Sequence, residues 1–203
     1  MIRLFAIPIA LCTLPMAFNA VALAQDQSQA HAAMAGAQNE KKHSHAQKHV
    51  VDLPENRRDA SADLIGATGE RIGEVVISDG PHGMVIRVEA QGIEKGFHGV
   101  HFHQVGTCAD AADGFKAAGP HIGVSGAEHG LLNPDGYHTG ALFPNIYAAA
   151  EGHLHTELFG SGLTLEDIED EDGFTLIVHV NEDDHVTQPL GGAGARIACA
   201  AFR

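Results

Sequence analysis

The chain has 203 residues, enough for one ordinary domain with an additional segment at one end. It contains no Trp and 24 Gly, which favours a loop-rich β protein over a helical bundle, where Gly is costly. A formal net charge of −14 argues against nucleic acid and anionic membrane surfaces as partners. Fifteen His against twelve Lys plus Arg make metal binding the first hypothesis, because histidine is the commonest metal ligand among side chains.

The first 24 residues are typical of a signal peptide. A positive start precedes an almost continuous apolar run over residues 4–23, which ends in the small-x-small triplet 22–24. Two prolines and an asparagine interrupt the run and no charged stop follows it, which disfavours a transmembrane anchor. A lipid anchor on Cys12 is the other alternative, although Leu11 is large for the position before a lipidated cysteine. We therefore expect an exported protein without a membrane anchor, located in a periplasm or else secreted.

Cysteine usage agrees with export. Removal of the leader takes Cys12 with it and leaves Cys108 and Cys199. Two cysteines in an oxidising compartment most simply pair with each other, the alternative being two separate buried thiols.

Residues 25–58 are polar and lack apolar periodicity, which predicts a disordered extension. The extension contains five soft or borderline metal ligands: His31, Met34, His43, His45 and His49. Two interpretations stay open. The segment is either an arm that collects copper and feeds the site, or a solvated tether whose histidines have no specific role.

Residues 59–203 have the pattern of an antiparallel β domain. Short β-type runs, separated by turn signals, cover residues 62–65, 72–77, 84–88, 99–103, 174–180 and 195–200. Strands at this spacing favour a sandwich or barrel. The stretch from Cys108 to Asn145 has little strand character and predicts a long loop, and loops of that length are commonly functional.

Six histidines occupy strand and loop positions that suit a metal site. His101 and His103 are two apart on a β-type run, so both imidazoles should project from one face. In the run 174–180, the alternation points Ile177 and His179 outward, away from the core. The long loop supplies three more histidines: His121, His129 and His138. One such histidine alone is more often structural, but six together predict a metal centre.

Six segments, in order, resemble the successive motifs of copper–zinc superoxide dismutases of the bacterial exported type. They are GFHGVHFHQVGTC at 96–108, AAGPHIG at 117–123, EHG at 128–130, GYH at 136–138, LIVHVNEDD at 176–184 and GGAGARIAC at 191–199. The resemblance covers the chain from about residue 60 to its C-terminus. It implies an all-β fold, a Greek-key antiparallel β-barrel or sandwich with long metal-binding loops.

The resemblance also implies a role for each matching residue. The copper ligands would be His101, His103, His121 and His179. His121 would be the imidazolate shared with zinc, and His129 and His138 would complete the histidine part of the zinc site. Asp183 matches a carboxylate that links a copper histidine to a zinc histidine, and Arg196 matches the arginine that guides superoxide. The two cysteines left after export match the family disulfide, Cys108–Cys199.

One position departs from the family pattern. The fourth zinc ligand of the family is an Asp three residues after the third zinc histidine, where this chain has Ala141. Alanine cannot bind a metal, so zinc would keep three histidines and at most water, with Asp135 or Glu128 as substitutes. Weak zinc binding, a looser loop or a copper-only protein is the expected result.

The resemblance implies dismutation of superoxide to oxygen and hydrogen peroxide by a copper centre cycling between Cu(II) and Cu(I), an antioxidant function outside the cytoplasm. In that scheme the bridging nitrogen of His121 takes up a proton when copper is reduced. The alternative is a copper-binding or copper-storage module on the same fold, which the His/Met extension and Ala141 favour. A structural sandwich with vestigial ligands is a third reading, and a homodimer is one of the oligomeric states that the sequence allows.

Overall fold

The computed structural model describes residues 57–123 and 128–203. The predicted signal peptide and nearly all of the predicted extension over 25–58 lie outside these residues. No helix in the described ranges is long and apolar enough to span a bilayer.

The described residues contain nine strands. They are β1 (Asp59–Gly66), β2 (Arg71–Gly80), β3 (Gly83–Ala90), β4 (Gly96–His98), β5 (Val100–His103), β6 (Ile146–Ala148), β7 (Leu154–Ser161), β8 (Phe174–His179) and β9 (Arg196–Phe202). Helical structure in the same residues is confined to α2 (Leu165–Ile168) and four single 3-10 turns, η1 (Ala111–Asp113), η2 (Lys116–Ala118), η3 (Thr139–Ala141) and η4 (Ala150–Gly152).

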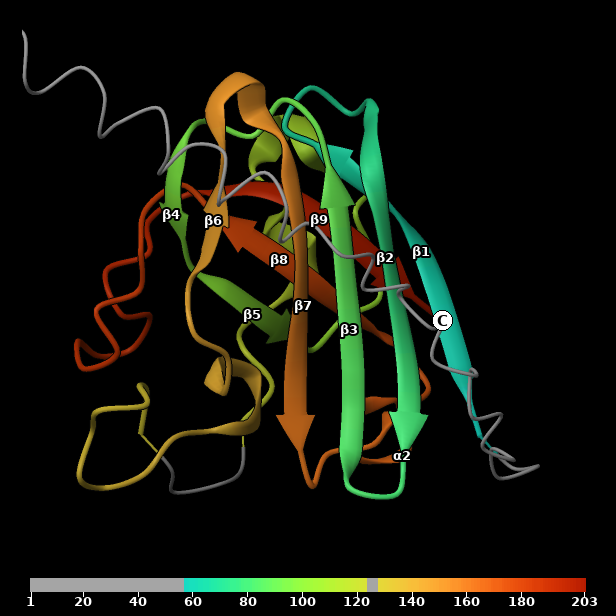
Figure 1. The fold of residues 1–203 in the computed structure, drawn as a ribbon, viewed down its shortest axis with the longest axis vertical. Helices are drawn as coiled ribbons and strands as arrows, with labels where there is room; N and C mark the ends of the chain where they lie inside the picture. The colour runs from blue at the N-terminus through green and yellow to red at the C-terminus, as the bar shows by residue number, and fades with distance from the viewer. Residues whose placement is uncertain (1–56, 124–127) are drawn as a thin grey trace, which may run out of the picture. The chain divides into compact units, whose positions relative to one another are not determined.

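Seven strands form one antiparallel sheet in the order β5-β8-β9-β1-β2-β3-β7, and β4 pairs with β6 in a separate ladder. The chain leaves β3 near one edge of the sheet and enters β5 at the other edge, then crosses again from β7 to β8, as Greek-key connections do. In Figure 1 the strands β1, β2, β3 and β7 run upright, and β9, β8 and β5 cross behind them. The curled sheet confirms the predicted all-β Greek-key class.

Each of the six predicted β-type runs lies in a strand to within one residue at the predicted ends, but β4, β6 and β7 lie where no strand was expected. β4 and β6 are only three residues long. β7 is a full strand paired with β3 over eight residues. Its inward residues include Leu154 and Leu158, whereas Phe159 points outward and is 54% exposed, which weakens the apolar alternation.

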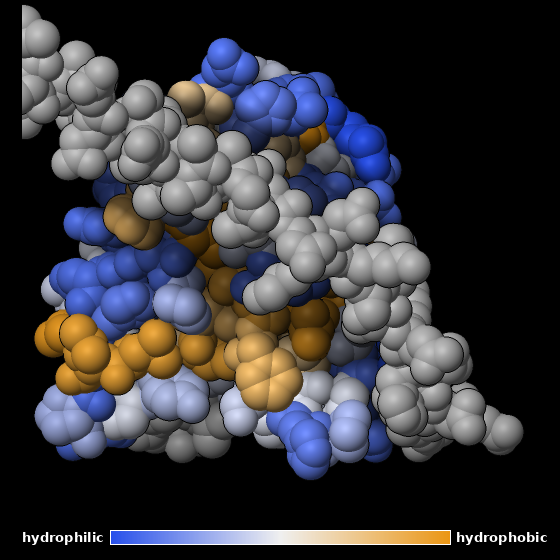
Figure 2. All heavy atoms as spheres, in the orientation of Figure 1, coloured by the Kyte–Doolittle hydropathy of each residue, from blue (hydrophilic) through white to orange (hydrophobic). Residues whose placement is uncertain are grey.

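The interior of the curled sheet holds the main core, which includes the fully buried side chains Leu64, Ile77, Ile86, Phe102, Phe174 and Leu176. Burying a side chain of this size contributes about 1.5–3 kcal/mol. The opposite face of the sheet is largely charged around β3 and β7, where Arg87 pairs with Glu157 at 2.7 Å. Figure 2 shows an apolar area low in this view. Val85 and Phe159, which are paired between β3 and β7, are exposed on this face of the sheet.

A second, smaller apolar cluster lies on the outer side of β8 and β9. It consists of Phe115, Ala118, Ile177 and Cys199. Ile177 is paired with His101 on β5 and Cys199 on β9, and directly paired residues lie on the same face of a sheet. The prediction that Ile177 points away from the main core is therefore confirmed. Ile177 is nevertheless fully buried, because the long loop after β5 folds over this face and covers it.

Candidate metal centre

Strands β5 and β8 place three histidines under the long loop. His101 and His103 alternate with the core residue Phe102 on β5, so both project to the outer face of the sheet. His179 ends β8, beside a register shift between Val178 and His179. All three histidines are buried.

The loop after β5 brings the other three histidines to the same place. His121 forms an isolated β-bridge with His103, which fixes its position against the sheet. The structure brings together two overlapping sets, whose ligand atoms lie within 4.8 Å of one another in each set: His101, His103, His121 and His179 in one, and His121, His129 and His138 in the other. His121 belongs to both sets, and its ring centroid lies 4.3 Å from that of His101 and 5.2 Å from that of His138.

The hydrogen bonds of the rings leave one side of each ring free for a metal. His103 Nδ1 lies 2.8 Å from the carbonyl oxygen of Gly119, and His179 Nδ1 lies 3.1 Å from that of Gly194. The opposite nitrogen of each ring is buried without a partner, as are Nδ1 of His101, His129 and His138 and both nitrogens of His121. Buried nitrogens without hydrogen bonds are costly, so this pattern fits metal ligands whose tautomers are set by their outer contacts.

Asp183 contacts one histidine of each set, on the side of the ring opposite the unpartnered nitrogen. Its carboxylate lies 2.7 Å from His101 Nε2 and 2.9 Å from His129 Nε2, the nitrogens that face away from the unpartnered ones. The backbone N–H of His185 also donates to it. Burial raises the pKa of Asp183, but the hydrogen bonds from His101 and His129 outweigh burial and hold that pKa below its usual range.

Burial favours the neutral form of the four histidines in the set of His101, His103, His121 and His179. It lowers the pKa of His103 to about 2 and that of His179 to about 3, because the charged imidazolium is poorly solvated there. The pKa of His121 is lowered for the same reason, with the neighbouring histidines adding to the effect. A neutral imidazole is the form that binds a metal, so the site is in its ligand form at neutral pH.

A pocket reaches the histidines from solvent and is lined by Lys116, Gly119, Pro120, His121, His138, Pro189, Leu190 and Arg196. The guanidinium of Arg196 donates to the carbonyl oxygens of Phe115 and Gly119 at 2.5 and 2.6 Å. These partners are neutral, so the positive charge of Arg196 is not cancelled by a paired carboxylate. Lys116 is a second cation on this pocket, and no sequence motif pointed to it.

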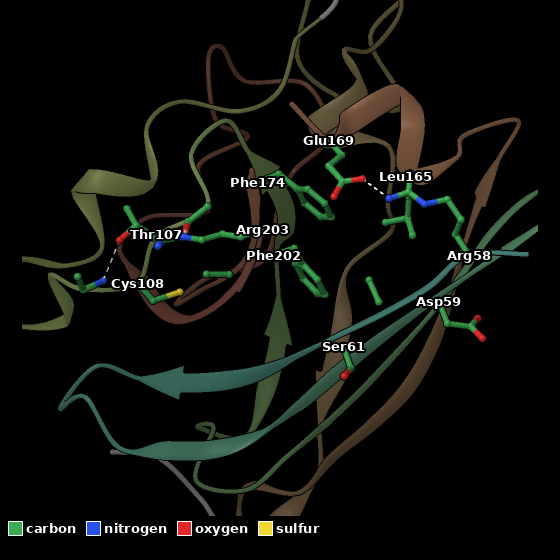
Figure 3. A pocket seen from close by; sticks show the side chains of 14 residues that line it. Arg58, Asp59, Ser61, Thr107, Cys108, Leu165, Glu169, Phe174, Phe202 and Arg203 are labelled. Carbon is green, nitrogen blue, oxygen red and sulfur yellow. Dashed lines mark hydrogen bonds and ion pairs between the residues drawn. The ribbon is translucent and has the colours of Figure 1, made fainter. Parts of the chain in front are cut away.

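The predicted disulfide is present. Cys108 and Cys199 are bonded with a Cα–Cα distance of 5.8 Å and a sequence separation of 91. A different pocket lies beside Cys108, where Figure 3 shows Thr107, Phe202 and Arg203 around it and Arg58 paired with Glu169. Its lining contains no histidine, so it has no part in the metal centre.

Known proteins resemble this chain in sequence. A family model described as copper/zinc superoxide dismutase matches residues 71–202. The chain belongs to the copper/zinc superoxide dismutase family. The Cu-Zn superoxide dismutase of Caulobacter vibrioides is 40% identical over 151 residues, which cover 71% of this chain and 85% of that protein.

Solved structures agree with this family assignment. The Cu/Zn superoxide dismutase from Brucella abortus matches with a TM-score of 0.60 at 31% identity. The match covers 72% of this chain and 100% of that one. A superoxide dismutase-like protein from Bacillus subtilis has a TM-score of 0.65 at 31% identity, covering 70% of this chain and 97% of that one.

Ala141, where the chain departs from the superoxide dismutase pattern, is buried beside the set of His121, His129 and His138. Ala141 is 1% exposed, ends η3 and donates its N–H to the carbonyl oxygen of His138. The side chains of Asp135 and Glu128 are exposed, and neither joins the three-histidine set in the part of the chain that the structure describes.

Two positioning contacts were not predicted. His98 is buried with Nδ1 2.8 Å from the carbonyl oxygen of His179 and Nε2 2.7 Å from that of Glu94. It therefore links the backbone at His179 to the segment just before β4. Gln188 pairs with both backbone groups of His129: Oε1 accepts from the N–H at 2.8 Å and Nε2 donates to the carbonyl at 2.9 Å. His98 lies in the motif at 96–108, which was a usable signal, whereas the Gln188 contact spans 59 residues and has none.

Replacing Gln188 should weaken zinc binding at the superoxide dismutase site. Gln188→Leu removes both hydrogen bonds to His129, each worth about 0.5–1.5 kcal/mol, so we expect the zinc dissociation constant to rise roughly tenfold. Competition with a coloured chelator measures it. Gln188→Glu keeps the acceptor and loses the donor, so its constant should lie between those of the wild type and Gln188→Leu. Equal constants for all three proteins would contradict the positioning role.

Proposed function

We propose that the protein dismutates superoxide to oxygen and hydrogen peroxide at a copper ion held by His101, His103, His121 and His179, with a zinc ion held by His121, His129 and His138. The observation that carries the proposal is the convergence of buried, unpartnered imidazole nitrogens at a pocket that also holds Arg196. Copper bound by imidazoles supplies one-electron oxidation and reduction, which zinc cannot. The donor set and the family membership both support this assignment.

Arg196 attracts the anionic substrate, superoxide, to the copper position. The chain carries a net charge of −14, which repels superoxide at long range. A guanidinium held by two backbone carbonyls, with Lys116 on the same pocket, supplies a local positive field against that repulsion. Superoxide dismutase is itself a standard example of such steering.

His121 has the task of holding a proton at the ring nitrogen that faces the copper set. Both of its nitrogens lack protein partners, so one can face each metal position. Asp183 keeps His101 and His129 in the tautomers that present Nδ1 to the metals.

The location and assembly of the protein are part of the same proposal. The disulfide supports an oxidising compartment, a periplasm in a bacterium, with residues 1–24 as the signal peptide. Residues 25–58 would collect copper through their His and Met side chains, and residues 59–203 would form the enzyme. A homodimer is supported by the exposed aromatic pair Phe97 and Tyr147, whose ring centroids are 4.9 Å apart on the ladder of β4 and β6.

The rate of superoxide dismutation by protein loaded with copper alone tests the proposal. We expect a rate constant approaching about 10⁸–10⁹ M⁻¹s⁻¹, a ceiling that superoxide dismutase is known to reach. Arg196→Met should keep its copper and lose roughly tenfold or more in rate, with a weaker dependence on ionic strength. A wild-type rate no better than that of free copper would reject the enzyme and favour the copper-storage alternative.

A further inference from the structure

The zinc position in this chain has three protein ligands and no fourth. The inference below rests on the proposed zinc role of His121, His129 and His138. Their ligand atoms lie within 4.8 Å of one another, and no carboxylate or thiolate joins that set in residues 57–123 and 128–203. The neighbouring residues 124–127 are Val, Ser, Gly and Ala, which contain no His, Cys, Asp or Glu.

The nearest carboxylates are engaged elsewhere. Asp183 touches His129 at Nε2, the side of the ring opposite its unpartnered Nδ1, and also binds His101. Both Asp135 and Glu128 have exposed side chains. At the position where a family member carries its carboxylate, the methyl group of Ala141 is buried and has no donor atom.

The pocket described above lies against two of the three histidines. His121 and His138 line that pocket together with the cations Lys116 and Arg196. Two positive charges at the entrance favour a small anion over a cation.

We propose that the zinc position takes its fourth ligand from solution, as water or a small monovalent anion that enters from the Arg196 pocket. Zinc in proteins is nearly always four-coordinate, and three histidines with an exchangeable fourth position are the pattern of open rather than structural sites. Ala141 is the residue that leaves the position open. The site therefore binds an exogenous ligand that a four-ligand zinc site excludes.

Cobalt substitution tests the proposal. Co(II) takes the zinc position with similar ligands, and its visible absorption depends on the number and kind of ligands. The full chain, with Cu(I) filling the copper position under anaerobic conditions, is loaded with Co(II) and titrated with azide. Cu(I) has a filled d shell and does not absorb in the visible range, so the spectrum reports the zinc position alone.

We expect a saturable shift of the cobalt bands in the wild type and loss of that shift in Ala141→Asp, which supplies a fourth protein ligand. If cobalt bands form in the wild type but do not change when azide is added, the proposal is overturned. The variant Glu128→Gln, Asp135→Asn would then show whether one of these carboxylates occupies the position, by gaining the azide response. A shift that persists in folded, cobalt-loaded Ala141→Asp would also overturn it, and if that variant does not fold, the wild-type titration decides.

Absence of any cobalt band has a different meaning. It would show that the three histidines do not hold the metal, which rejects the zinc assignment of the proposed function as well as the open position.

Discussion

The double variant Cys108→Ala, Cys199→Ala should lose about 4.5 kcal/mol of its free energy of unfolding. The disulfide joins residues 91 apart in the sequence, and closing a loop of that length removes a large chain entropy from the unfolded state. Domains of this size are stable by only about 5–15 kcal/mol, so the variant would lie near the limit of folding. Urea unfolding of metal-free protein, followed by circular dichroism, measures the difference.

The same change should also reduce activity in protein that remains folded. The disulfide anchors the start of the segment whose carbonyl groups, at Phe115 and Gly119, hold Arg196. Wild-type protein with its disulfide reduced is the matched control, because it keeps both cysteine side chains and loses only the bond. If the free energy of unfolding fell by less than about 1 kcal/mol in both the double variant and the reduced wild type, the entropic explanation would be contradicted.

Asp183→Ala should weaken the binding of both metals. Its carboxylate contacts one histidine of the copper set and one of the zinc set, and removing such an outer contact typically costs about 10–100-fold in affinity. The change also leaves the Nε2 groups of His101 and His129 buried without this partner. Chelator competition, carried out separately for copper and zinc, measures both constants.

Asp184→Asn is the matched control for this variant. Asp184 is the next residue along the chain, but it is exposed. Among the described residues its side chain bonds only to Thr187 and to the backbone of Val186 and Thr187. We expect its metal affinities to stay at the wild-type values. If Asp183→Ala changed the affinity for one metal only, the carboxylate would not link the two sets in solution.

The strand residues of the site were more predictable than its loop contacts. His101 and His103 share a face because strand alternation is a local property, and β5 places them as the alternation predicts. β7 escaped prediction because Phe159 points outward and Gly160 inward, so its alternation is diluted. The burial of Ile177 was missed for another reason: it depends on Phe115 and Ala118, which come from a loop distant in sequence.

The geometry of the loops could not be predicted from the sequence, because it also depends on contacts between residues far apart in the chain. The motifs identified His121, His129 and His138, but the contacts that hold this region are made across long separations. Gln188 reaches His129 over 59 residues, and Asn145 Nδ2 donates to the carbonyl oxygen of Asp183 over 38. No local pattern encodes such pairs.

The membership of His121 in both histidine sets has a thermodynamic consequence. When one metal ion fixes the His121 ring, the second ion does not incur the entropic cost of fixing it again. Binding at one position therefore changes the affinity at the other. By linkage the effect is reciprocal: whatever factor zinc adds to the affinity for copper, copper adds to the affinity for zinc. At the proposed site, copper loading should therefore change the affinity for zinc by the same factor by which zinc loading changes the affinity for copper.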